Sequence, residues 1–100
     1  MPNEYLVTLT VAPAIEESLV DWLLEFHGQV GFTSFSVHGH SSRPEGLTLA
    51  EQVSGRRKQT RFQIHLSSEQ TANFIENLRS DFGGVGLHYW VSPVLESGRI

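Results

Sequence analysis

Residues 60–84, TRFQIHLSSEQTANFIENLRSDFGG, contain the change of hydrophobic period that decides the fold. Up to Leu66, polar and apolar side chains alternate, which predicts a half-buried strand. Ser67 is followed at the third position by Gln70, the pattern of a helix-capping box. Apolar residues then recur at helical spacing until the glycine pair, and these are Ala72, Phe74, Ile75, Leu78 and Phe82. The stretch therefore predicts a strand followed directly by an amphipathic helix.

The N-terminal part of the chain has the same order. Residues 4–11 alternate between apolar and mixed side chains, which predicts a first strand. Pro13 suits a first helical turn because its missing N–H would have no helical partner there. Apolar residues at helical spacing then predict a helix over about 14–27, ended by Gly28.

Two further strands complete the set. Over residues 32–40 apolar and polar side chains alternate, which predicts a second strand. We expect Phe35 and Val37 to share one face of that strand. The opposite face of that strand would then carry Ser34, Ser36, His38 and His40. Residues 87–91 predict the last strand, with Pro93 at its break or at an edge.

The predicted order is βαββαβ, which makes the chain an α+β protein of the ferredoxin-like class. We expect a four-stranded antiparallel sheet of spatial order 4-1-3-2, with both helices on one face. A length of 100 residues supports one core, so residues 1–100 are expected to form a single domain. The second sheet face would be too mixed for a core, and burial against other subunits is expected for Leu6, Thr8, Ser34, Ser36, His38, His40, Arg61, Gln63, His65, His88 and Trp90.

Composition narrows the classes of partner. The formal net charge is −4, which argues against a nucleic-acid backbone as the main partner. The chain has no cysteine, so it can form neither a disulfide nor a thiolate metal site. An acidic residue, Glu4, stands where a secretory signal would carry a cation, and no apolar stretch is long enough to span a bilayer. We expect a cytoplasmic protein without membrane insertion.

The segment 41–57 predicts a long loop between the second and third strands, and loops of this length are usually functional or disordered. At its end Arg56, Arg57 and Lys58 form the main basic run of the chain. Such a run can bind a phosphate or an acidic surface, although most charge runs are simply solvated.

Three of the five histidines suggest a metal site. His38 and His40 lie two apart on a strand, hence on one face, and neutral imidazole is a common ligand for Zn, Cu(II) and Ni. His88 would lie at the same end of the sheet but about 14 Å away, three strand spacings, so it could join them only across a trimer contact. Hydrated polar residues on a sheet face are the more common interpretation of this pattern.

The run FSVHGH at 35–40, with LAEQVSGRR at 49–57, resembles an uncharacterised PII-like family whose genes often accompany heavy-metal efflux pumps. The resemblance implies a homotrimer that binds a ligand between subunits. The ligand would lie near the base of the long loop, with Gly39, Arg56, Arg57 and Lys58, and near the loop before the last strand, residues 81–86. The resemblance also implies a metal-efflux transporter as a possible regulated partner. The loop at 81–86 lacks the Lys found in nucleotide-binding relatives, which argues against a nucleotide, whereas Zn or Cu stays a candidate cofactor.

Other functions of this topology fit less well. An RNA-recognition domain needs stacking aromatic residues where Arg61 and Gln63 are expected, and an acylphosphatase needs an Arg in the segment 10–14. No nucleophile motif or nucleotide-binding motif is present, and we expect no enzymatic activity. The sequence predicts a ligand- or metal-responsive regulatory protein acting through its long loop on a partner. The alternative is a histidine-based metal-binding protein linked to metal tolerance.

Overall fold

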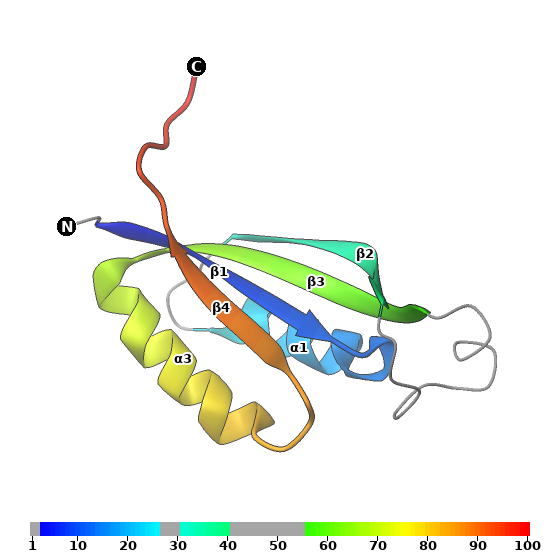
Figure 1. Ribbon diagram of the computed structural model, residues 1–100. Coiled ribbons are helices and arrows are strands. Elements are labelled where there is room, and N and C mark those ends of the chain that lie inside the picture. The colour runs from blue at the N-terminus through cyan, green and yellow to red at the C-terminus, as the bar shows by residue number, and fades with distance from the viewer. Residues whose placement is uncertain (1–2, 27–30, 41–55) are drawn as a thin grey trace.

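The computed structural model describes residues 3–26, 31–40 and 56–100, which form four strands and two helices (Figure 1). In chain order the elements are β1 (Glu4–Val11), α1 (Pro13–Glu25), β2 (Phe32–His40), β3 (Arg56–Ser67), α3 (Ser68–Phe82) and β4 (His88–Pro93). Among the helices of these residues, none has the length and apolarity needed to cross a membrane.

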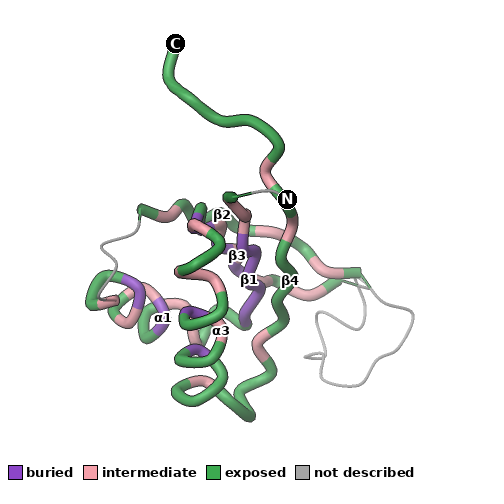
Figure 2. The backbone as a smooth tube through the Cα atoms, turned by 90° about the vertical axis from the view of Figure 1, so that its left-hand side faces the viewer, coloured by how far each residue is buried: buried purple, intermediate pink, exposed green. Residues whose placement is uncertain are grey.

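The strands form one antiparallel sheet in the order β2-β3-β1-β4, which is the predicted order. Both helices lie on the same side of this sheet (Figures 1 and 2). The α+β ferredoxin-like arrangement predicted from the hydrophobic periods is therefore confirmed.

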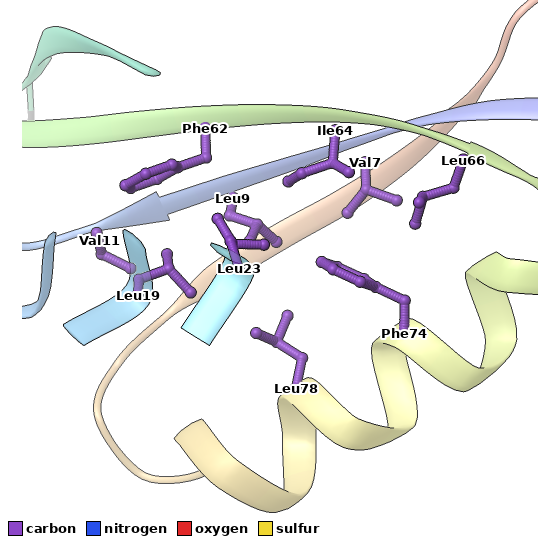
Figure 3. Packing of buried hydrophobic residues seen from close by; sticks show 10 residues of the cluster. All are labelled: Val7, Leu9, Val11, Leu19, Leu23, Phe62, Ile64, Leu66, Phe74 and Leu78. Carbon is purple, nitrogen blue, oxygen red and sulfur yellow. The ribbon is translucent and has the colours of Figure 1, made fainter. Parts of the chain in front are cut away.

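The core lies between the sheet and the helices and is made of ten buried apolar side chains (Figure 3). They are Val7, Leu9 and Val11 of β1, Leu19 and Leu23 of α1, Phe62, Ile64 and Leu66 of β3, and Phe74 and Leu78 of α3. Within Val7–Val11 of β1 and Phe62–Leu66 of β3, every second residue faces this core, because successive side chains of a strand point to opposite faces.

The start of α3 is fixed by the predicted capping box. The Ser67 hydroxyl accepts a hydrogen bond from the Gln70 backbone N–H at 3.2 Å, and the Gln70 side chain accepts one from the Ser67 N–H at 3.0 Å. Two N–H groups without helical partners are satisfied in this way. By contrast, α1 begins after Ala12 without a side-chain cap, with Pro13 in its first turn.

Several predicted boundaries need correction. β3 begins at Arg56 and not at residue 60, so Arg56 and Arg57 belong to a strand and not to the loop. Strand β4 includes Pro93 as its last residue, where a missing N–H is tolerated at a sheet edge. Helix α1 ends at Glu25, and the predicted stop at Gly28 lies outside the described residues.

The predicted division of β2 into two faces is confirmed, but the prediction of which face turns away from the helices is wrong. Phe32 pairs with buried Ile64 and its ring lies 6.2 Å from that of Phe62, so Phe32 faces the helices. Directly paired residues of an antiparallel ladder point to the same face. Phe35 and Val37 therefore lie on the face away from the helices, and the helix-side face carries Ser34, Ser36, His38 and His40. A shift of one residue in the assumed parity reverses every side chain of a strand.

The face away from the helices carries a polar contact that spans three strands. The Arg61 Nε donates to the Thr10 Oγ1 at 3.1 Å, and the guanidinium carbon lies 5.1 Å from the centre of the Trp90 ring. Thr8 and Thr10 lie on this face and are nevertheless buried. Trp90 and Phe35 nevertheless remain 44% and 42% exposed, so the face keeps apolar surface.

Candidate ligand site at the end of the β2–β3 ladder

The longest strand of the sheet, β3, extends beyond its neighbour β1. Their ladder ends at the pair Val11 and Thr60, whereas β3 starts four residues earlier at Arg56. Over these four residues β3 pairs only with β2. Residues 37–40 and 56–59 thus form a two-stranded extension, here called the terminal ribbon, from whose ends the segment 41–55 connects (Figure 1).

The terminal ribbon brings together six of the seven predicted site residues. Because β2 and β3 pair antiparallel, residues that are far apart in the chain become direct partners. The pairs are His40 with Arg56, Gly39 with Arg57, and His38 with Lys58. The basic run and the two neighbouring histidines therefore form one cluster, a result that sequence spacing alone does not give.

The two faces of the ribbon carry different groups. His38, His40, Arg56 and Lys58 share the helix-side face, since they continue the parity of buried Thr60, and all four are exposed. Cβ atoms of direct partners in such a ladder lie about 4.5–5.5 Å apart. Two side chains that are cationic at neutral pH thus lie beside two imidazoles, and the paired residues 37–40 and 56–59 include no carboxylate.

Gly39 lies on the opposite face of the ribbon. A Cβ at this position would meet the Gln59 Oε1 at 2.5 Å, so the Gln59 side chain occupies the space beside the glycine. The Arg57 side chain shares this face, because Arg57 is the direct partner of Gly39. A side chain at position 39 would therefore require the end of the Gln59 side chain to move. Arg57 and Gln59 are both partly buried.

His88 does not join the cluster within one chain. It pairs with Thr10, which pairs with Arg61, which pairs with Phe35. His88 is thus level with Phe35 on the far edge of the sheet, about 14 Å from β2 across three strand spacings. Within residues 3–26, 31–40 and 56–100, no group of three or more His, Cys, Asp or Glu side chains is arranged to hold a metal ion.

His65 is at the opposite end of β3, where its Nε2 lies 3.2 Å from the Glu4 Oε1. His27 lies outside the described residues.

Comparison with known proteins agrees with this fold. The family model described as "Protein of unknown function (DUF3240)" matches residues 1–100. The chain belongs to the DUF3240 family. No curated protein matches the sequence of this DUF3240 chain.

Three solved structures share the fold of the DUF3240 chain. A DUF3240 family protein from Shewanella baltica has a TM-score of 0.78 at 24% identity, covering 100% of this chain and 99% of the other. A functionally unknown protein from Pediococcus pentosaceus has a TM-score of 0.71 at 17% identity, with 100% of both chains covered. A protein from Thermus thermophilus, provisionally named as PII-like signalling, has a TM-score of 0.62 at 20% identity, covering 93% of this chain and 88% of the other. The PII-like relationship expected from the sequence is thus supported at the level of the fold.

The DUF3240 chain also has a pocket beside the loop 81–86, and sequence reasoning did not predict the lining that α3 and β4 contribute to it. It lies between the C-terminal half of α3 and the start of β4, with a volume of about 390 Å³. Its lining includes Arg79 and Tyr89, whose side chains are joined by a hydrogen bond of 3.2 Å. The glycines at 83, 84 and 86 were the available sequence signal, because a run of glycines before a strand often leaves backbone open to a ligand.

Proposed function

We propose that this protein is a PII-like regulatory protein that binds a small anionic ligand at the terminal ribbon. Binding there changes the segment 41–55 and so controls docking on a partner protein. The observation that carries the proposal is the antiparallel pairing of Arg56, Arg57 and Lys58 with the residues 38–40. This pairing supports an anion site at the two chain positions from which the long connection starts.

The charge of the terminal ribbon supports an anionic ligand more than a metal ion. The chain has a net charge of −4, yet this end of the sheet has three consecutive cationic residues. A phosphate or carboxylate is attracted there, and charge-assisted hydrogen bonds from Arg and Lys are among the stronger polar contacts in proteins. A divalent cation held by His38 and His40 would instead lie beside Arg56 and Lys58 and be repelled by both.

Isothermal titration calorimetry with ATP, ADP, AMP and inorganic phosphate tests the anion site. We expect at least one of them to bind. The double variant Arg56→Gln/Lys58→Gln should weaken binding by about 10-fold or more for each cationic side chain removed, since a hydrogen bond to a charged group contributes about 1.5–3 kcal/mol. Arg99→Gln, in the exposed C-terminal tail, is the matched control and should leave binding unchanged. Absence of binding by all four anions, or equal weakening by the control, would contradict the proposal.

The effect of anion binding on the strands that flank the segment 41–55 can be followed in the same protein. Hydrogen exchange of the amides in residues 37–40 and 56–59 should slow when the anion is bound, because a ligand that spans both strands stabilises their pairing. If these amides exchange at the same rate with and without bound anion, the proposed effect of binding on the segment 41–55 is wrong, even though the anion binds.

A histidine-based metal site is the second candidate, favoured by one observation. His38 and His40 are exposed side by side on the same face of β2. In this proposal a third ligand, His88, comes from a neighbouring subunit, so the site requires a homotrimer. Native mass spectrometry with Zn and Cu should then show a trimer that retains metal and loses it in His38→Ala/His40→Ala. A monomer, or a trimer whose metal content is unchanged in the variant, would exclude this site.

The regulated partner follows from the resemblance to the PII-like family associated with metal efflux. In this proposal the partner is a metal-efflux transporter, the protein acts in the cytoplasm, and its role involves no catalytic step. Retention of such a transporter on immobilised protein only when the ligand of the terminal ribbon is present would support this. Retention that is equal for the wild type and Arg56→Gln/Lys58→Gln would oppose it.

A further inference from the structure

The pocket between α3 and β4 has the features of a second ligand site. Its volume of about 390 Å³ falls within the range of roughly 300–1,000 Å³ typical of small-molecule pockets. The strand order places β4 at one edge of the sheet and β2 at the other, so this pocket is separate from the terminal ribbon. The walls are formed by one helix, one strand and the turn between them.

Most of the lining is apolar. Ile75, Leu78 and Phe82 come from one side of α3, and Leu87 comes from the residues just before β4. Leu78 is 3% exposed and belongs to the core, whereas the other three are partly buried at its border. An apolar ligand in this pocket would therefore extend the core outward and remove these side chains from water.

The turn between α3 and β4 keeps one side of the pocket open. Gly84 and Gly86 have φ values of +90° and +81°, a backbone region that residues with a Cβ rarely adopt. Gly83, at the C-cap of α3, has no room for a Cβ, which would lie 2.7 Å from the Arg79 carbonyl oxygen. These three glycines contribute no side chain to the pocket, so backbone atoms form its border there.

One polar pair is set into this apolar lining. The Arg79 Nη2 donates to the Tyr89 hydroxyl at 3.2 Å, which joins α3 to β4 across the pocket. The phenol oxygen accepts this bond, so its own O–H can still donate to another group. None of the lining residues that the structure describes is acidic, and the guanidinium therefore has no carboxylate partner within the pocket.

We propose that this pocket binds a small monocarboxylate with an apolar body, with the carboxylate held by Arg79 and Tyr89 and the apolar part against α3 and Leu87. A guanidinium presents paired N–H groups that match the two oxygens of a carboxylate. The apolar lining excludes highly charged ligands such as nucleotides, because only one cation lines the pocket to balance them. The site does not depend on the anion site of the terminal ribbon.

Titration of ¹⁵N-labelled protein with octanoate, followed by NMR, tests this site. We expect chemical-shift changes centred on residues 75–89 and tighter binding of octanoate than of 1-octanol, the neutral compound of equal chain length. Because Arg79 is exposed, its ion pair is partly screened, and Arg79→Met should weaken octanoate binding by about 5-fold while 1-octanol binding stays constant. Tyr89→Phe should give a smaller loss.

The control variants distinguish the carboxylate pocket from the anion site proposed at the terminal ribbon. Arg56→Gln/Lys58→Gln should bind octanoate as the wild type does, and Arg79→Met should leave anion binding at the terminal ribbon unchanged. Equal affinity of octanoate and 1-octanol in the wild type would overturn the proposal. So would shifts located outside α3 and β4, or an Arg79→Met variant whose octanoate affinity is unaltered.

Discussion

The side-chain parity of β2 can be tested with a matched pair of phenylalanine substitutions. Phe32 packs against the core, whereas Phe35 lies on the opposite face and is 42% exposed. Replacing a fully buried Phe by Ala costs about 3–5 kcal/mol. Since Phe32 is only partly buried, we expect Phe32→Ala to lower the free energy of unfolding by about 2–3 kcal/mol. Phe35→Ala should cost less than about 1 kcal/mol in an isolated chain.

Urea denaturation of both variants at several protein concentrations gives the two values. If the face that carries Phe35 and Trp90 is buried between subunits, the loss caused by Phe35→Ala will depend on protein concentration, because association stabilises the folded chains by mass action. A loss from Phe35→Ala that equals or exceeds the loss from Phe32→Ala at every concentration would refute the parity assigned to β2.

Three further predictions concern local contacts. Ser67→Ala should lower the free energy of unfolding by about 1 kcal/mol in urea denaturation, since it removes half of the capping box; no change would mean that the cap is redundant. Gly84→Ala should cost about 1–2 kcal/mol, because its φ of +90° strains any residue with a Cβ, and a thermal melt equal to that of the wild type would argue against this turn geometry. Glu4→Gln should cost less than about 1 kcal/mol in urea denaturation, because its contact with His65 is exposed on both sides and is an ion pair only when the imidazole is protonated. A loss above about 1 kcal/mol would contradict this.

The order of the elements follows from the sequence because two physical signals agree. The period of two over residues 60–66 and the period near 3.6 after it leave few alternatives, and the Ser67 cap marks the boundary between them. The same agreement occurs in β1 and α1. The sheet order then follows from the preferred connections of this layer arrangement.

The orientation of the two faces of β2 could not be predicted in the same way. Phe32 and Phe35 are three residues apart, so they have opposite parity, and the Ser and Thr residues between them fit either face. Only the pairing of Phe32 with Ile64 and its contact with Phe62 decide between the two.

The candidate sites were predictable to different degrees. Residue types indicated both His38 with His40 and the basic run from Arg56, but their pairing depends on the register between strands that 15 residues, 41–55, separate. The contribution of α3 and β4 to the pocket was not predicted, because Arg79 and Tyr89 come from different elements and look like ordinary surface residues when each is considered alone. A hydrogen bond between the two exists only after β4 has packed at the sheet edge.

The terminal ribbon makes the length of the connection between β2 and β3 a quantity that the protein can vary. Its end pair, His40 with Arg56, is the last pair of the ladder in the described residues, and neither side chain belongs to the buried core. Isolated two-stranded pairing is of marginal stability, so separating this pair costs little and adds one residue from each strand to the connection. The next pair, Gly39 with Arg57, can separate in the same way until Thr60, where β1 begins to support β3. A ligand that joins both strands would therefore select one length from a graded series, while the four-stranded part of the sheet stays as it is.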